Sequence, residues 1–237
     1  MDVPNAPITQ LYQYSPSAWR NTTVEIVEKL DKENPGMLVK RGGDYGYYPL
    51  FYAIYYNANI SVINYIIKEM VETYQYPEMY RANLKQNMIH SLYESTHCWK
   101  YSTIKHIQLI VNQDVEVLTR KNMFGTIPLY FAVKNGATIE VLVWLCEQTG
   151  IDVVRKWRSD GWGEVRSHTE ATFLHLAAWY NHPHMIPYLL SIFPEAVDLK
   201  SNYRFTPLAW AKKWNFQTII DLLINPQATV NEYLEDP

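Results

Sequence analysis

The chain has 237 residues, a length that suits one repeat array or two small domains. Its net charge is −3, so no bulk basic field draws it to nucleic acid or to anionic lipid. No run of about 18 apolar residues occurs, and the first residues lack the basic and apolar regions of a secretory signal. The two cysteines, Cys98 and Cys146, fit a reducing compartment without a disulfide framework. We therefore expect an intracellular, cytoplasmic protein without membrane insertion.

The first 36 residues predict an arm followed by a helix. Residues 1–15 hold Pro4 and Pro7 among polar residues, which indicates an extended or disordered arm. Ser15 and Pro16 are typical of a helix start, as the capping residue and the first helical residue. We expect an N-terminal capping helix within residues 16–36, with an apolar stripe of Trp19, Thr23, Ile26, Val27 and Leu30.

A six-residue motif then recurs along the chain. The second residue of each copy lies near position 49, 88, 128, 173 or 207, which gives steps of 39, 40, 45 and 34 residues. The copy near 88 departs most from the others, because it lacks the proline and has Leu92 where the others have alanine. The copies are residues 48–53, 87–92, 127–132, 172–177 and 206–211.

The copy near 128 shows what each unit should look like. Gly125 allows a tight left-handed turn, and Pro128 fixes φ at the first position of a short helix. Asn135 and Gly136 break that helix, and a second apolar stripe begins at Ile139. Two short helices have thin apolar faces that one unit cannot bury alone, so each unit needs neighbours of the same kind.

The motif and its spacing resemble the ankyrin repeat, whose T-P-L-H-x-A signature recurs roughly every 33 residues with two helices per unit. The resemblance covers about residues 40–224 and implies an all-α fold, an ankyrin-repeat α-solenoid with finger loops. We assign the array to residues 37–224, with the preceding helix as its cap. The remaining residues, 225–237, are expected to form a loose, acidic C-terminal tail.

About ten residues are inserted at 156–170, before the copy near 173. Insertions in repeat proteins form loops and often mark the binding face. Trp157 and Trp162 argue against a surface loop that contacts nothing, because a tryptophan side chain in a loop usually packs against another surface. Two readings stay open: the loop binds a partner, or it packs on the next finger.

The sequence holds no phosphate-binding glycine loop, zinc-protease motif or nucleophile elbow. His97 and Cys98 have only His106 nearby, and His182 and His184 have no cysteine or carboxylate close in sequence, so a metal site is not favoured. The resemblance implies that His175 bonds backbone in the next turn. We expect no catalytic residue, no cofactor and no metal.

The resemblance also implies a concave face, lined by the residues before each inter-helix turn and by the finger residues. We predict a protein-interaction module or scaffold that binds one or more partner proteins there; nothing in the sequence indicates a homo-oligomer or a nucleic-acid ligand. One alternative is a structural subunit of a large assembly, which the low charged fraction of 19% favours; an enzyme is the least favoured. The predicted binding residues, with the loop tryptophans, are Tyr45, Tyr47, Tyr55, Tyr56, Phe124, Lys134, Trp157, Trp162, Trp179, Tyr180, Tyr203, Phe205 and Trp214.

Overall fold

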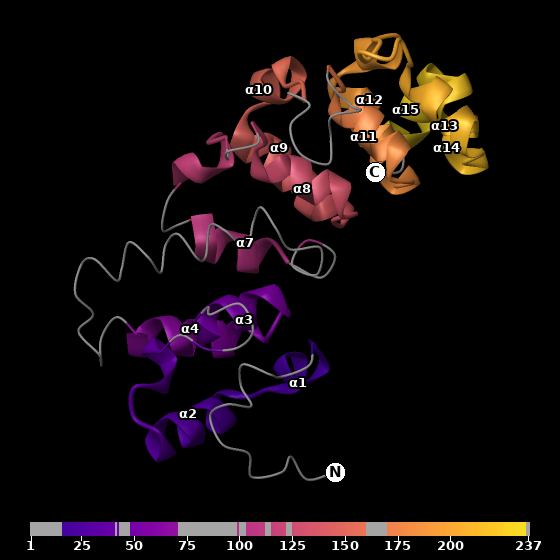
Figure 1. Cartoon of the computed structure of the whole chain (residues 1–237). Coiled ribbons are helices and arrows are strands. Elements are labelled where there is room, and N and C mark those ends of the chain that lie inside the picture. The colour runs from indigo at the N-terminus through magenta and orange to yellow at the C-terminus, as the bar shows by residue number, and fades with distance from the viewer. Residues whose placement is uncertain are drawn as a thin grey trace. The chain divides into compact units, whose positions relative to one another are not determined.

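The structure is a computed structural model that describes residues 16–40, 42, 48–70, 99, 103–111, 115–121, 125–159 and 170–235. The regular elements of this described part are all helices, which confirms the all-α prediction (Figure 1). The chain divides into two compact units, residues 1–114 and 115–237. Several predicted features lie outside the described residues: the arm of residues 1–15, the motif copy near 88, and the site candidates Tyr45, Tyr47, Phe124 and Trp162.

The first unit buries its apolar side chains between short helices. Helix α2 contacts α4, and α3 contacts both α4 and the short helix η2. Trp19, Leu50 and Ile66 are fully buried in this unit. Its described elements are α1 (Pro16–Asn21), α2 (Val24–Glu33), η2 (Met37–Val39), α3 (Pro49–Tyr55), α4 (Ile60–Lys68) and α7 (Ile104–Val111).

The single capping helix expected within residues 16–36 is instead two helices, α1 and α2. Thr23 lies in extended backbone at the break, where its side chain accepts a hydrogen bond from the Ile26 amide. Thr22 Oγ1 donates to the Ala18 carbonyl at 2.7 Å. Threonine side chains bond nearby backbone in this way and so favour a cap over a helix interior. Thr23 is therefore exposed, whereas its expected stripe partners Trp19 and Val27 are buried.

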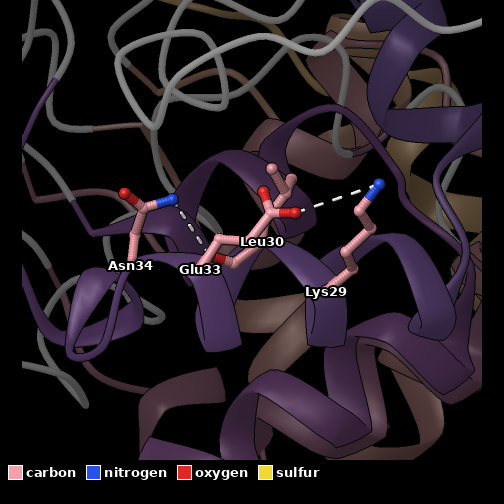
Figure 2. Close-up of polar contacts among 4 residues, drawn as sticks. All are labelled: Lys29, Leu30, Glu33 and Asn34. Atoms are coloured by element: carbon pink, nitrogen blue, oxygen red, sulfur yellow. Dashed lines mark hydrogen bonds and ion pairs between the residues drawn. The ribbon is translucent and has the colours of Figure 1, made fainter.

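The exposed face of α2 carries charged side chains in pairs. Lys29 lies 3.9 Å from Glu33, and the Asn34 side chain donates to the Leu30 carbonyl at the end of the helix (Figure 2). Lys32 forms a second pair with Glu28 at 2.6 Å. Exposed pairs of this spacing contribute only about 0.3–0.5 kcal/mol each, so burial of the opposite face holds α2 in place.

The second unit consists of helix pairs joined by short turns. Its elements, in chain order, are η4 (Val115–Leu118), α8 (Pro128–Lys134), α9 (Ile139–Thr149), α10 (Ile151–Lys156), α11 (Phe173–Trp179), η6 (Pro183–Met185), α12 (Ile186–Ile192), η7 (Pro194–Val197), α13 (Pro207–Trp214), α14 (Gln217–Ile224) and α15 (Pro226–Glu235).

The first helix of each described pair ends in the same way. A residue with positive φ stands eight positions after the second motif residue: Asn57 (59°), Gly136 (70°), Asn181 (58°) and Asn215 (55°). The next amide then bonds a carbonyl five residues back, as in Ala137 to Ala132 at 3.0 Å. The same bond joins residues 58 and 53, 182 and 177, and 216 and 211. The described motif copies therefore form one repeating structural unit, closed by a left-handed helix end.

A second left-handed residue recurs three positions before the second motif residue. Gly125 has φ 71°, which confirms the predicted turn. Glu170 (64°) and Arg204 (59°) adopt the same conformation despite their Cβ atoms, at a cost of about 1–2 kcal/mol each. The repeat thus imposes its turn geometry even where the sequence does not supply glycine.

The first helices of the pairs in the second unit, α8, α11 and α13, lie side by side and are called the first-helix row below. Helix α11 contacts α8 on one side and α13 on the other. Each member also contacts its own second helix: α9, α12 and α14, respectively. Stacking of this kind buries the apolar faces that no single pair could bury.

Residues 226–235 form a helix and not part of the loose tail that we expected for residues 225–237. Asn225 and Pro226 end α14 as predicted, but Pro226 is also the first residue of α15. Helix α15 packs on α12 and α14, and Thr229 Oγ1 donates to the Leu222 carbonyl at 2.7 Å. The Tyr233 ring lies 6.3 Å from the Tyr188 ring. The acidic composition of this segment therefore did not indicate that it forms a helix with one packed face.

Replacement of Leu129 by alanine tests the core of the second unit. Leu129 is only 1% exposed, so Leu129→Ala should lower the free energy of unfolding by about 2–5 kcal/mol in denaturant melts. Val153→Ala is the control, because Val153 is 41% exposed and should cost well under 1 kcal/mol. A loss below about 1 kcal/mol for Leu129→Ala would contradict this helix register.

His182 gives the fold a specific dependence on pH. Its Nε2 atom bonds the Lys134 carbonyl at 3.0 Å, and burial lowers the pKa of His182 below the ordinary 6.5 although that bond opposes the shift. The unfolded chain therefore binds this proton more readily, so stability is complete above pH 6.5 and falls as pH drops towards the folded pKa. His182→Gln should remove this part of the fall between pH 7.5 and 5.5 in urea melts.

The exposed neighbour His184, which bonds the Ala137 carbonyl at 2.9 Å, provides the control for this measurement. His184→Gln leaves His182 in place, so it should keep the part of the stability loss that His182 causes. An unchanged loss in His182→Gln would show that His182 is not a source of the pH dependence.

Candidate functional site

Five aromatic side chains meet where α11 approaches α13. Trp179 is the last residue of α11, Trp210 and Trp214 lie one turn apart on α13, and Tyr203 and Phe205 belong to the turn before α13. The Trp210 ring centroid lies 4.3 Å from that of Trp179, 4.7 Å from that of Phe205 and 6.5 Å from that of Tyr203. The Trp179 and Trp214 centroids are 5.5 Å apart. We call these five residues the aromatic cluster.

The aromatic cluster has a buried base and an accessible rim. Trp210 is only 2% exposed, whereas Trp214 is 49% and Tyr203 is 54% exposed. Trp179 and Phe205 are half-buried. Side chains of this size usually lie in a core, so the rim offers a rigid apolar surface that contact with a partner would bury.

A single cation lies among these rings. Lys213 Nζ is 5.0 Å from the Trp210 centroid, 5.4 Å from that of Phe205 and 5.9 Å from that of Trp214. Ammonium groups within about 6 Å of a ring face are attracted by its quadrupole. Lys213 is exposed, so its positive charge is presented to solvent at the aromatic cluster.

The buried imidazole of His175 bonds the backbone of Phe205, whose carbonyl also accepts from the Ser201 amide. The Thr172 amide donates to His175 Nδ1 at 3.2 Å, so Nε2 carries the ring proton and bonds the Phe205 carbonyl at 3.1 Å. The Thr172 side chain caps α11 and also bonds Nδ1, at 2.8 Å. This contact with the next turn is the structural role that the sequence predicted for His175.

Other predicted residues contact side chains that are not part of the aromatic cluster. Lys134 Nζ, at the end of α8, lies 6.0 Å from the centroid of the Tyr180 ring. Tyr55 and Tyr56 belong to the first unit, where Tyr55 stacks on Phe51 at 5.5 Å and both tyrosines are half-buried. Of the described candidates, Trp179, Tyr203, Phe205 and Trp214 belong to the aromatic cluster, whereas Lys134 contacts Tyr180 and Tyr55 contacts Tyr56, with ring centroids 4.9 Å apart.

Trp157 is not a surface residue, contrary to its inclusion among the binding residues. It is 5% exposed and stacks on Phe173 with centroids 4.2 Å apart and rings inclined by 16°. Trp157 packs on the next helix pair. For this residue the structure therefore supports the second interpretation of the inserted segment, packing within the chain. Its indole Nε1 has no hydrogen-bond partner in the described part of the chain.

The sequence analysis missed Trp210 as a site residue. Its place in the motif copy of residues 206–211 marked it only as part of a short helix. The signal that could have found it is spacing: Trp210, Lys213 and Trp214 stand three and four residues apart on one face of α13.

Cys146, the cysteine within the described residues, belongs to the core. Cys146 is buried, and burial raises the pKa of its thiol to about 12, so it stays protonated at neutral pH. Among the described residues, no three or more histidines, cysteines and carboxylates gather in a way that could hold a metal ion. No helix in the described ranges is long and apolar enough to span a membrane.

Comparison with models of known protein families gives no match, and comparison with curated proteins gives none either. The resemblance to ankyrin repeats therefore remains a prediction that depends on the motif copies and their spacing.

Substitution of Trp157 separates a core role from a binding role. Trp157→Ala should lower the free energy of unfolding by about 3–5 kcal/mol, because a buried, stacked indole is lost. Trp157→Phe should cost less than Trp157→Ala, since it keeps a ring beside Phe173 and removes the unbonded N–H. Trp214→Ala, at the exposed rim, should cost less than half as much as Trp157→Ala. A cost below about 1 kcal/mol for Trp157→Ala would contradict its burial.

Proposed function

We propose that the chain is an ankyrin-repeat protein-interaction module or scaffold that binds a partner protein through the aromatic cluster. One observation carries the proposal: Trp214, which packs on Trp179, and Tyr203, which packs on the buried Trp210, are each about half exposed. The ankyrin assignment is supported by the motif spacing and by the left-handed helix end that recurs in each described pair. We assign the activity to the cytoplasm and propose no catalytic step.

The aromatic cluster is suited to provide binding energy. Tryptophan and tyrosine are enriched among the few interface residues that dominate affinity, because they offer large contact area for little side-chain entropy. Here ring packing already restrains Trp214 against Trp179 and Tyr203 against Trp210 in the free chain. A partner that covers Trp214 and Tyr203 would therefore pay little additional ordering entropy.

A structural subunit of a larger assembly is the second candidate. Large apolar side chains are also exposed away from the aromatic cluster: Val153 (41%) on α10, Ile224 (62%) on α14 and Leu234 (64%) on α15. A subunit gripped on several faces would bury all of these, whereas a partner docked on the aromatic cluster would leave them in water.

Site-specific photo-crosslinking in cells distinguishes the two candidates. A benzophenone amino acid at position 214 should capture one partner protein, and the same group at Glu140 or Ile224 should not capture it. Glu140 is exposed on α9 and serves as the matched surface control. Equal capture from all three positions would favour the subunit, and no capture from position 214 would overturn the proposed function.

The captured partner then allows a quantitative test. Trp214→Ala combined with Tyr203→Ala should weaken binding by at least about 2 kcal/mol, roughly thirty-fold, in a titration with purified partner. The unfolding midpoint should change little, because both side chains are at the rim. Glu140→Ala should leave the affinity unchanged; a loss equal to that of the double change would contradict a site on the aromatic cluster.

A further inference from the structure

Charge is distributed unevenly over the second unit. The three helices of the first-helix row contain no aspartate or glutamate, and their charged residues are Lys134, Lys212 and Lys213. The acidic residues of the described second unit all lie on other elements or turns. They are Glu116, Glu140, Glu147, Asp152, Glu170, Glu195, Asp198, Asp221, Glu232 and Glu235.

The basic residues in and beside the aromatic cluster form no ion pair within the described part of the chain. Lys213 lies over three of its rings, and the turn that carries Tyr203 also carries Lys200 and Arg204, both exposed. None of these three cations forms an ion pair with a described residue. The ammonium group of Lys213 at these rings therefore has no anionic partner among the described residues.

We propose that the partner segment that occupies the aromatic cluster is acidic, with one or more carboxylates beside apolar or aromatic side chains. This inference rests on the proposed function and narrows its partner. A carboxylate would meet the Lys213 ammonium, while its apolar neighbours would cover Trp214 and Tyr203. The rings would supply most of the affinity, and the charge would select against neutral and basic segments.

Single-stranded nucleic acid is another anionic ligand for aromatic and basic residues, but the ring geometry disfavours it. Base stacking needs open ring faces. The Trp179 ring stands at 87° to both Trp210 and Trp214, so these rings pack edge to face against one another. The net charge of −3 also opposes the counterion-release binding that polyanions require.

Selection from a random peptide library on the immobilised full chain tests the inference without a known partner. Peptides that lose binding to the Trp214→Ala, Tyr203→Ala variant report the aromatic cluster. These peptides should be enriched in aspartate and glutamate relative to the unselected library. Their affinity should fall at least tenfold in Lys213→Glu, remain in Lys213→Arg and weaken as salt concentration rises.

Lys212→Glu is the matched control. Lys212 is exposed, and Lys212→Glu makes the same change of charge as Lys213→Glu. The Lys212 side chain projects from a different face of α13, because successive helical residues are about 100° apart. It should change affinity less than threefold. Denaturant melts of both variants should match the unmodified chain, which shows that any loss arises at the site.

The outcomes separate the inference from the function on which it rests. Peptides that need Trp214 and Tyr203 but are neutral or basic, or bind Lys213→Glu equally well, would overturn the acidic partner and leave the proposed function standing. A labelled oligo-dT that binds the aromatic cluster more tightly than any selected peptide would also overturn it. If no selected peptide depends on Trp214 and Tyr203, both proposals fail.

Discussion

The hydrogen bond from His175 to the Phe205 carbonyl joins one helix pair to the turn of the next, and the candidate site depends on it. The imidazole is buried, with Thr172 on one nitrogen and Phe205 on the other. The Phe205 carbonyl also accepts from the Ser201 amide, so the group that needs this bond is the buried Nε2–H of His175. An unsatisfied buried donor would cost about 1–3 kcal/mol, so this bond stabilises one arrangement of α11 and the following turn. Phe205 then packs on Trp210, and Trp210 packs on Trp179.

A similar linkage joins the α8–α9 pair to the α11–α12 pair through different residues. His182 bonds the carbonyl of Lys134, and His184 bonds the carbonyl of Ala137. Both acceptors lie at the α8–α9 turn. Gly136 belongs to that turn, and a Cβ atom there would lie 2.7 Å from the His182 ring. Three histidines thus connect neighbouring helix pairs of the second unit through backbone acceptors.

The sequence predicted those parts of the structure that local chemistry determines. Proline at the first helical position and the Asn-Gly break located α8 and its end, because φ restriction and left-handed turns are properties of single residues. Trp157 and Trp210 could not be placed in this way. Both are large amphipathic residues. The burial of Trp157 depends on packing against Phe173 in the next helix pair, and the burial of Trp210 depends on packing against Phe205 in the turn before α13.

Two further differences also have a nonlocal origin. An acidic composition suggested a loose tail at 225–237, but α15 is held by contacts with α12, which no local pattern reveals. The site likewise became identifiable only when Trp179 and Trp214, on different helices, were found in contact. Repeat positions in the sequence indicated candidate binding residues. Tertiary contacts bring four of them together in the aromatic cluster: Trp179, Tyr203, Phe205 and Trp214.

The central claim is that a bound partner covers Trp214 and its neighbours. Fluorine NMR of the full chain labelled with 5-fluorotryptophan measures this directly, because each of the eight tryptophans gives one resonance and Trp→Phe variants assign them. On addition of a partner protein or selected peptide, the account predicts shifts for Trp179 and Trp214 and none for Trp19, which is fully buried in the first unit. A bound state in which the Trp214 resonance stays unchanged would contradict the account.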